Sequence, residues 1–151
     1  MTPTLALGID IGGTNTAFGL VDTAGTLLLK SSMPTKGFAT AEDYVSALRQ
    51  EIKAAAGSDL LQQIRGIGVG APSANYYRGT IEHAPNIEWR GIIPIGDLIA
   101  DAFGLPVKVT NDANAAAMGE MMYGAARGMN DFIMVTLGTG VGSGFVANGQ
   151  L

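Results

Sequence analysis

The fold is decided by the stretch Asp10-Ile11-Gly12-Gly13-Thr14-Asn15, which joins two short apolar runs near the start of the chain. The apolar content of residues 5–10 and 16–21 is typical of short strands, and the paired glycines between them end the first strand. A turn over residues 22–25 leads into a third expected strand over residues 26–32. The start of the chain therefore predicts an antiparallel meander.

Helical and strand-like segments alternate after this meander. Thr40 is suited to cap a helix with apolar residues at helical spacing up to Gly57, and a hairpin is expected to turn at Arg78-Gly79 inside the irregular segment 71–89. The other expected elements are a strand over 64–70, a helix over 95–103, a strand over 107–110, a helix over 111–126 and strands over 132–137 and 141–147. This order predicts an α/β fold with a mixed sheet and helices on its faces.

A second glycine turn, Gly138-Thr139-Gly140, also lies between two expected strands. Binding a phosphate through the backbone requires N–H groups that point into one concavity, and a side chain at those positions would block the approach. The turn at Gly12, Gly13 and Thr14 and the turn at residues 138–140 both meet this requirement, so together they can hold one polyphosphate. The alternative is that both are ordinary hairpin turns.

Two aspartates are candidates for chemistry at expected strand ends. Asp112 follows Asn111 where a strand passes into a helix, a point at which open α/β sheets present ligand-binding side chains. Asp112 is either a general base for a hydroxyl group or only the N-cap of its helix. Asp10 either holds Mg²⁺ through water or caps the adjoining turn. Three methionines at positions 118, 121 and 122 are interpreted as core filling.

Composition excludes several classes of protein. Of 151 residues, 22 are glycine, without the period of collagen, and none is cysteine, which excludes disulfides and thiolate metal sites. The net charge of −4, without basic runs, disfavours nucleic acid and anionic membranes as partners. The start of the chain does not read as a signal peptide and no apolar run is long enough for a membrane span, so a cytoplasmic protein is expected.

Four motifs, taken together, resemble the ROK family of sugar kinases. They are Asp10 to Asn15, Ala84-Pro85-Asn86 with Trp89, Asn111 to Ala117 with Gly119-Glu120, and Leu137 to Gly144, in family order and at family-like spacing. The resemblance implies an actin-like ATPase (ribonuclease H-like) fold, with Asp10, Gly12, Gly13, Thr14 and Asn15 as one phosphate motif and Gly138, Thr139 and Gly140 in the other. It also implies that Asp112 is the general base and that Asn86 and Asn111 contact the sugar. The cofactors implied by the resemblance are ATP and Mg²⁺.

The resemblance also implies which parts are missing. The segment Ala71 to Asn75 departs from the family's usual loop, so the sugar contacts of Ser73 and Asn75 stay open. The family continues with a Gly-Glu-x-Gly-His motif and a second ATP-binding domain, so residues 1–151 are expected to be the N-terminal domain, weakly active or inactive alone. The rivals are a sugar-responsive ROK transcriptional regulator, which needs a DNA-binding segment before Leu5, and a non-enzymatic actin-like module. The preferred hexose and any homo-oligomer stay open.

Overall fold

The computed structural model describes residues 4–137 and 140–151, and over these ranges the chain forms ten strands and three helices. The elements follow in the order β1 (Leu5–Ile11), β2 (Asn15–Asp22), β3 (Leu27–Pro34), α1 (Ala41–Leu61), β4 (Ile64–Ala71), β5 (Ala74–Asn75), β6 (Thr80–Glu82), β7 (Ile92–Ile93), α2 (Ile95–Phe103), β8 (Val107–Asn111), α3 (Asp112–Tyr123), β9 (Phe132–Leu137) and β10 (Val141–Val146).

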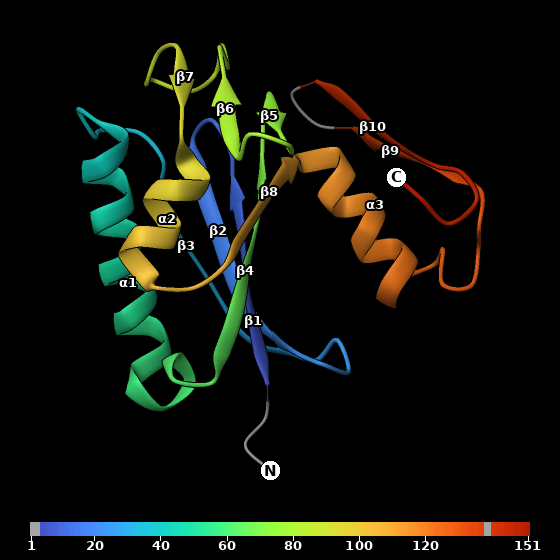
Figure 1. Ribbon diagram of the computed structural model, residues 1–151, viewed down its shortest axis with the longest axis horizontal. Coiled ribbons are helices and arrows are strands. Elements are labelled where there is room, and N and C mark those ends of the chain that lie inside the picture. The colour runs from blue at the N-terminus through green and yellow to red at the C-terminus, as the bar shows by residue number, and fades with distance from the viewer. Residues whose placement is uncertain (1–3, 138–139) are drawn as a thin grey trace.

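A five-stranded sheet in the order β3-β2-β1-β4-β8 forms the centre of the molecule (Figure 1). β1, β2 and β3 pair antiparallel, as the meander predicted, while β4 lies parallel to β1, and β8 lies parallel to β4. Helices α1 and α2 lie on one side of this sheet and α3 lies on the other. The predicted mixed sheet with helices on both faces is confirmed.

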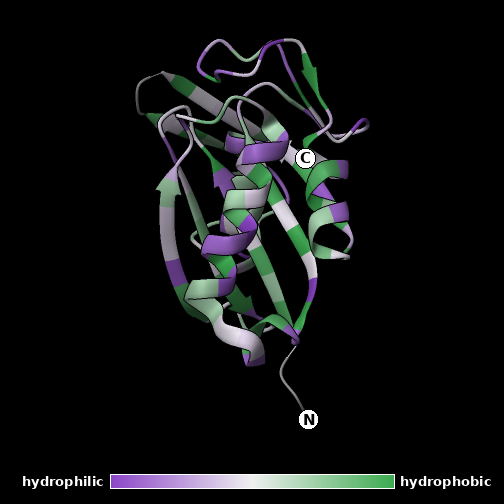
Figure 2. Cartoon of the chain, turned by 90° about the vertical axis from the view of Figure 1, so that its left-hand side faces the viewer, coloured by the Kyte–Doolittle hydropathy of each residue, from purple (hydrophilic) through white to green (hydrophobic). Residues whose placement is uncertain are grey.

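The hydrophobic core lies between the central sheet and the helix pair α1 and α2. In β1 the side chains alternate, so that Leu5, Leu7, Ile9 and Ile11 are buried while the residues between them are exposed. Helix α1 supplies Tyr44, Val45, Leu48 and Ile52, and α2 supplies Ile95 and Ile99. Figure 2, which faces α1, shows hydrophilic residues along the outer side of the helix layer. One face of the sheet is therefore covered along β1, β2 and β4 and partly covered at the edge strand β3.

Helix boundaries follow their expected caps with two exceptions. The Thr40 hydroxyl accepts a hydrogen bond from the Asp43 amide at 3.1 Å, as predicted, but the helix does not end at Gly57. Gly57 adopts φ 69° and interrupts the helix, which resumes and runs to Leu61. Helix α3 was expected over residues 111–126 but spans only Asp112–Tyr123.

The last two strands are not part of the central sheet. β9 and β10 pair with each other as a separate two-stranded sheet, and β5, β6 and β7 form a third sheet. The β9–β10 hairpin packs on α3 through its glycines: a β-carbon at Gly144 would lie 2.7 Å from the Ala117 β-carbon. The expectation that the methionines of α3 fill the core was wrong for Met118 and Met122, which are 38% and 51% exposed.

Among the residues that the structure describes, no helix combines the length and the apolar character needed to cross a membrane.

Candidate functional site

Parallel pairing brings the two candidate aspartates to the same edge of the central sheet. Asp10 on β1 lies opposite Gly70 on β4, and Gly70 lies opposite Thr110 on β8, two residues before Asp112. A β-carbon at Gly70 would lie 3.9 Å from Oδ1 of Asp10 and 3.6 Å from the α-carbon of Asp112. The small residue in the middle strand therefore leaves room for both carboxyl groups.

The environment of Asp10 disfavours its charged form. Partial burial raises the pKa of the Asp10 carboxyl above its ordinary value, and the nearby Asp112 carboxylate raises it further. Two carboxylates in one place are stabilised by a cation between them. In the described residues no group of three or more His, Cys, Asp or Glu side chains is arranged to hold a metal ion. Asp10 and Asp112 line one cavity, and a pair of carboxylates beside open space suits Mg²⁺, which keeps several waters and takes few protein carboxylates.

The strand-to-helix junction at β8 and α3 positions Asp112 by side-chain capping. Asn111, and not Asp112, is the N-cap: its Oδ1 accepts the Ala113 amide hydrogen at 3.0 Å. Asp112 is the first helical residue, and its Oδ1 accepts from the same amide at 2.8 Å. The interpretation of Asp112 as merely the N-cap was wrong. The side-chain amide nitrogen of Asn111 takes no part in this cap and can donate to a ligand.

The first glycine turn is tight, and its glycines have different roles. The Gly12 amide donates to the Asn15 carbonyl at 3.0 Å, so this N–H closes the turn and is not free to bind a phosphate. A β-carbon at Gly13 would lie 2.8 Å from both the β-carbon and the carbonyl oxygen of Asn86. The Thr14 carbonyl accepts from the Thr35 amide at 2.8 Å. The Gly12 amide is therefore not one of the free backbone donors expected in this turn, and the candidates for that role are the amides of Gly13 and Thr14.

The second glycine turn is only partly described. Gly138 and Thr139 lie outside the described residues. Gly140 and the adjoining ends of β9 and β10 line a cavity of about 720 Å³ that opens between the hairpin and the central sheet. The same cavity is lined by six of the residues predicted from the sequence, which are Gly12, Gly13, Asn86, Asn111, Asp112 and Gly140.

The remaining predicted residues lie around this cavity. Asp10 lines an adjoining cavity of about 870 Å³ that shares Gly12 and Asp112 with the first. Thr14 lines a smaller cavity of about 390 Å³ on the other side of Asn86. Asn15 is exposed and contributes its backbone carbonyl to the turn. The structure thus gathers the candidate sugar-binding residues and the candidate base, and leaves Thr14 and Asn15 outside the main cavity.

Several lining residues were missed or left open by the sequence. Ser73, Asn114 and Thr136 line the main cavity. Asn114 lies two positions after Asp112 near the start of α3, where ligands commonly bind, and this placement was the available signal. Ser73 has φ 51°, an unusual conformation for a residue other than glycine, which no sequence pattern reveals.

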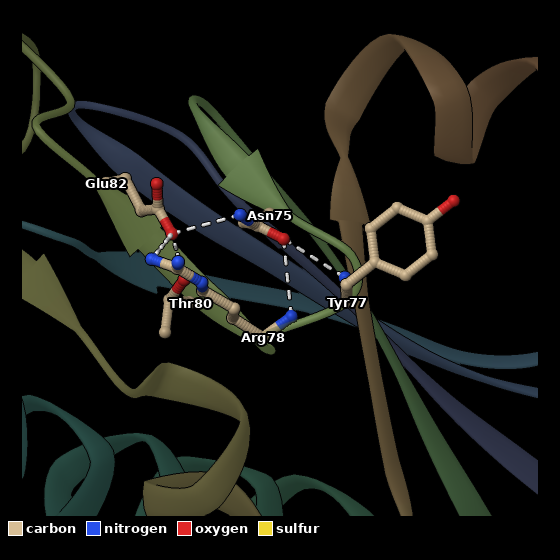
Figure 3. Close-up of polar contacts among 5 residues, drawn as sticks. All are labelled: Asn75, Tyr77, Arg78, Thr80 and Glu82. Carbon is tan, nitrogen blue, oxygen red and sulfur yellow. Dashed lines mark hydrogen bonds and ion pairs between the residues drawn. The ribbon is translucent and has the colours of Figure 1, made fainter.

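A carboxylate-centred network holds the loop that carries Ser73 (Figure 3). Oε1 of Glu82 accepts from the Asn75 side-chain amide at 3.1 Å and from the Thr80 hydroxyl at 2.9 Å. The Glu82 amide donates to the Ser73 carbonyl at 3.0 Å, and Oδ1 of Asn75 accepts from the amides of Tyr77 and Arg78. Glu82 therefore ties both strands of the β5–β6 hairpin to the edge of the cavity.

A buried cluster of aromatic rings and hydroxyls supports the loop that carries Asn86. The Trp89 ring packs on Tyr44 with centroids 4.6 Å apart, and its Nε1 donates to the Phe38 carbonyl at 3.3 Å. The Tyr44 hydroxyl forms a hydrogen bond with the Thr16 hydroxyl at 2.8 Å, and burial raises the pKa of Tyr44. The cluster connects α1, β2 and the Asn86 loop beneath the cavity.

The sheet topology, with a cavity at the edge of the sheet, is that of the actin-like ATPase fold found in the ROK sugar kinases. Solved structures of such kinases superpose on this chain. A ROK glucokinase from Streptomyces griseus, solved with glucose and AMPPNP, superposes with a TM-score of 0.82 at 40% identity over 96% of this chain and 45% of that one. The ROK family model matches residues 6–151. The chain belongs to the ROK family.

Curated relatives include both enzymes and regulators. The Streptomyces coelicolor protein named glucokinase is 40% identical over 148 residues, which are 97% of this chain and 45% of that protein. A Caldicellulosiruptor protein named putative xylose repressor is 32% identical over 147 residues, 94% of this chain and 36% of that protein. The chain thus spans less than half the length of these relatives.

Proposed function

We propose that this chain is the N-terminal domain of an ATP-dependent hexose kinase, which phosphorylates glucose to glucose 6-phosphate. The observation that carries the proposal is the shared cavity in which Asp112 lies with Asn86 and Asn111 and with three turn glycines, Gly12, Gly13 and Gly140. The similarity to proteins named glucokinase supports the sugar. The coverage of less than half of those relatives supports a second domain after residue 151 in the whole protein.

The proposed chemistry centres on the Asp112 carboxylate. A sugar hydroxyl that enters the cavity donates its proton to Asp112 while its oxygen attacks the terminal phosphorus of ATP, and ADP leaves with the electrons of the broken P–O bond. The side-chain amides of Asn86 and Asn111 orient the neighbouring hydroxyls. The glycine turns bind the phosphates, with backbone donors at Gly13 and Thr14 in the first turn.

Asp10 is the residue of this chain that would hold Mg²⁺, through water. When bound, the ion neutralises charge on the ATP phosphates. Burial, and in second place the charge of Asp112, raise the pKa of Asp10, and a cation beside the two carboxylates would favour the charged form against both effects.

Substitution of Asp112 by Asn in the full-length protein tests the proposal. The amide keeps the shape of the side chain but does not accept a proton, so turnover should fall by about 10²- to 10⁴-fold while glucose binding stays near that of the wild type. Asp97→Asn is the matched control, because Asp97 is exposed in the first turn of α2 and lines none of the three cavities. ADP release across a panel of hexoses measures both turnover and sugar preference. Retention of wild-type turnover by the Asp112→Asn protein contradicts the role.

A sugar-responsive regulator is the second candidate, and the similarity to a putative xylose repressor favours it. A regulator binds a sugar in the same cavity without transferring phosphate. The hexose panel separates the two candidates: sugar binding by calorimetry without ADP release in the full-length protein supports the regulator.

A further inference from the structure

Two basic side chains, Lys36 and Arg90, line the cavity of about 390 Å³ on the other side of Asn86, which is called the side cavity below. Thr14 and Glu88 also line it. Among the residues that the structure describes, no Lys or Arg lines the main cavity. In a chain with a net charge of −4, two positive charges therefore converge on one cavity outside the proposed site of phosphoryl transfer.

Two hydrogen bonds join the loops that carry these basic residues. The Gly37 amide donates to Oε2 of Glu88 at 3.1 Å, and Nε1 of Trp89 donates to the Phe38 carbonyl at 3.3 Å. One basic residue stands just before Gly37 in the chain, and the other stands just after Trp89. The Trp89 side chain is buried, so the second bond is protected from water. The fold therefore holds the two positive charges beside each other before any ligand binds.

The charge of the side cavity is not balanced. Glu88 is the one carboxylate among its described lining residues, and its Oε2 already accepts from the Gly37 amide. Within the described parts of the chain, the ion pair that forms joins Arg78 to Glu82 and includes neither basic residue of the side cavity. The side cavity thus has an excess of one positive charge and favours an anion.

The donor groups indicate which anion fits. The guanidinium of Arg90 can donate two parallel hydrogen bonds to one oxyanion, and the ammonium of Lys36 supplies a second, compact charge. The Thr14 hydroxyl is a third donor. Three separate donor groups suit a phosphate group, which has several acceptor oxygens, better than a carboxylate, which has two. The volume lies within the range of small-ligand pockets, about 300–1,000 Å³.

We propose that the side cavity is a binding site for a phosphate group other than the one transferred, bound by Lys36, Arg90 and Thr14. The phosphate belongs to free inorganic phosphate or to a phosphate monoester such as a sugar phosphate. Gly13 and Asn86 line both this cavity and the main one, so the occupant touches the wall of the proposed sugar site. The proposal concerns binding alone, and a failure of the kinase assay leaves it standing.

Acetylation of lysines in the full-length protein tests the site without any turnover. Lys36 is the reporter, and Lys53, exposed on α1 and outside the side cavity, is the internal control. Peptide mapping by mass spectrometry reads both rates in inorganic phosphate and in chloride of the same ionic strength. At ten times the half-protecting phosphate concentration, Lys36 should react about tenfold more slowly than in chloride, because about one site in ten is then free. Lys53 should react at the same rate in both.

Two substitutions should move the protection of Lys36 in opposite directions. Arg90→Gln should raise the half-protecting phosphate concentration by about tenfold or more, as expected when a hydrogen bond to a charged group is lost. Glu88→Gln should lower it, because the amide still offers an oxygen to Gly37 but carries no negative charge. Arg49→Gln, which removes the same charge from the exposed side of α1, is the matched control and should leave protection unchanged.

The source of the phosphate is found by comparing ligands. A lower half-protecting concentration for glucose 6-phosphate than for inorganic phosphate assigns the site to a monoester, and equal values assign it to free phosphate. Equal acetylation of Lys36 with and without these ligands overturns the proposal. Protection that Arg90→Gln leaves unchanged also overturns it. So does protection by Mg²⁺ with a non-hydrolysable ATP analogue that neither phosphate ligand reproduces, because the two basic residues would then serve the nucleotide.

Discussion

Gly13 lies so close to Asn86 that a β-carbon on Gly13 would stand 2.8 Å from both the β-carbon and the carbonyl oxygen of Asn86. The contact joins the turn between β1 and β2 to the loop supported by Trp89. In the proposed kinase, the contact joins Gly13, which would bind phosphate, to Asn86, which would bind the sugar. The glycine is therefore needed for packing as well as for backbone access.

Gly13→Ala should displace Asn86 and weaken sugar binding in the full-length protein. A displacement of about 1 Å at a positioning residue costs up to about 100-fold in rate, so kcat/KM for the sugar should fall by about 10- to 100-fold. Gly119→Ala is the control, because a β-carbon there meets nothing within 4 Å and the change favours the helix. Steady-state kinetics with glucose measures the effect, and equal kcat/KM for both variants would remove Gly13 from this role.

The pKa shifts of Asp10 and Asp22 predict opposite effects of pH on stability. The raised pKa of Asp10 means that its carboxyl favours the fold while protonated, below the ordinary value of 3.8, and that this contribution is lost as pH rises through the raised pKa. Asp10→Asn, which mimics the protonated form, should therefore stabilise the chain at neutral pH, and the gain should vanish in acid. Urea unfolding across the pH range measures it. If Asp10→Asn instead lowers the free energy of unfolding at neutral pH, the predicted effect of Asp10 is contradicted.

Asp22 is the matched comparison. Hydrogen bonds from the Thr26 amide, with smaller contributions from Ala24 and Gly25, lower the pKa of Asp22. Its carboxylate stabilises the fold above the ordinary value of 3.8 and loses that effect as pH falls through the lowered pKa. Asp22→Asn should therefore destabilise the chain at neutral pH and have little effect in acid, the reverse of Asp10→Asn.

Glu82→Ala should loosen the loop that carries Ser73. The change removes the acceptor of Thr80, whose side chain is buried, and leaves that hydroxyl unpaired, at a cost of about 1–3 kcal/mol in the free energy of unfolding. Glu82→Gln keeps an oxygen acceptor and should lose much less, because the exposed ion pair with Arg78 at 3.8 Å contributes little. Chemical unfolding compares the two, and an equal loss from both would assign the effect to the ion pair.

Gly144→Val should separate the β9–β10 hairpin from α3. The β-carbon added at position 144 would lie 2.7 Å from the β-carbon of Ala117, which is too close for two carbon atoms. Overpacking of this kind costs about 1–3 kcal/mol in the free energy of unfolding. Hydrogen exchange should speed up in β9 and β10 while β1 stays protected. Ser143→Val is the control on the opposite, exposed side of the same strand. Unchanged exchange in the Gly144→Val hairpin would show that the contact does not hold it.

Local signals in the sequence were enough for most elements. The bounds of α2 match the prediction of residues 95–103, because Gly104 ends it in the left-handed conformation that glycine favours. The meander followed from its turns, and the position of Asp112 at a strand end placed it beside the cavity. The resemblance supplied Asn86, which no local rule would have selected.

Tertiary packing decided what the sequence left out. The separate sheet of β9 and β10 arises because Gly142 and Gly144 fit against the alanines of α3, a contact between segments that no single-segment pattern encodes. Met118 is exposed because it lines the cavity beside Asp10 and does not enter the core. The use of the Gly12 amide within its own turn likewise depends on the position of the Asn15 carbonyl.

The separation of the two sheets has a mechanical consequence. In the described residues no strand ladder links the hairpin to the central sheet, and α3 packs against both. The position of the hairpin, with Gly140 at its end, relative to the central sheet therefore depends on α3, whose first residue is Asp112. In the proposed kinase, a nucleotide that draws the hairpin toward the central sheet would tilt α3 and move Asp112 in the same step, so that phosphate binding and orientation of the proposed base would be coupled.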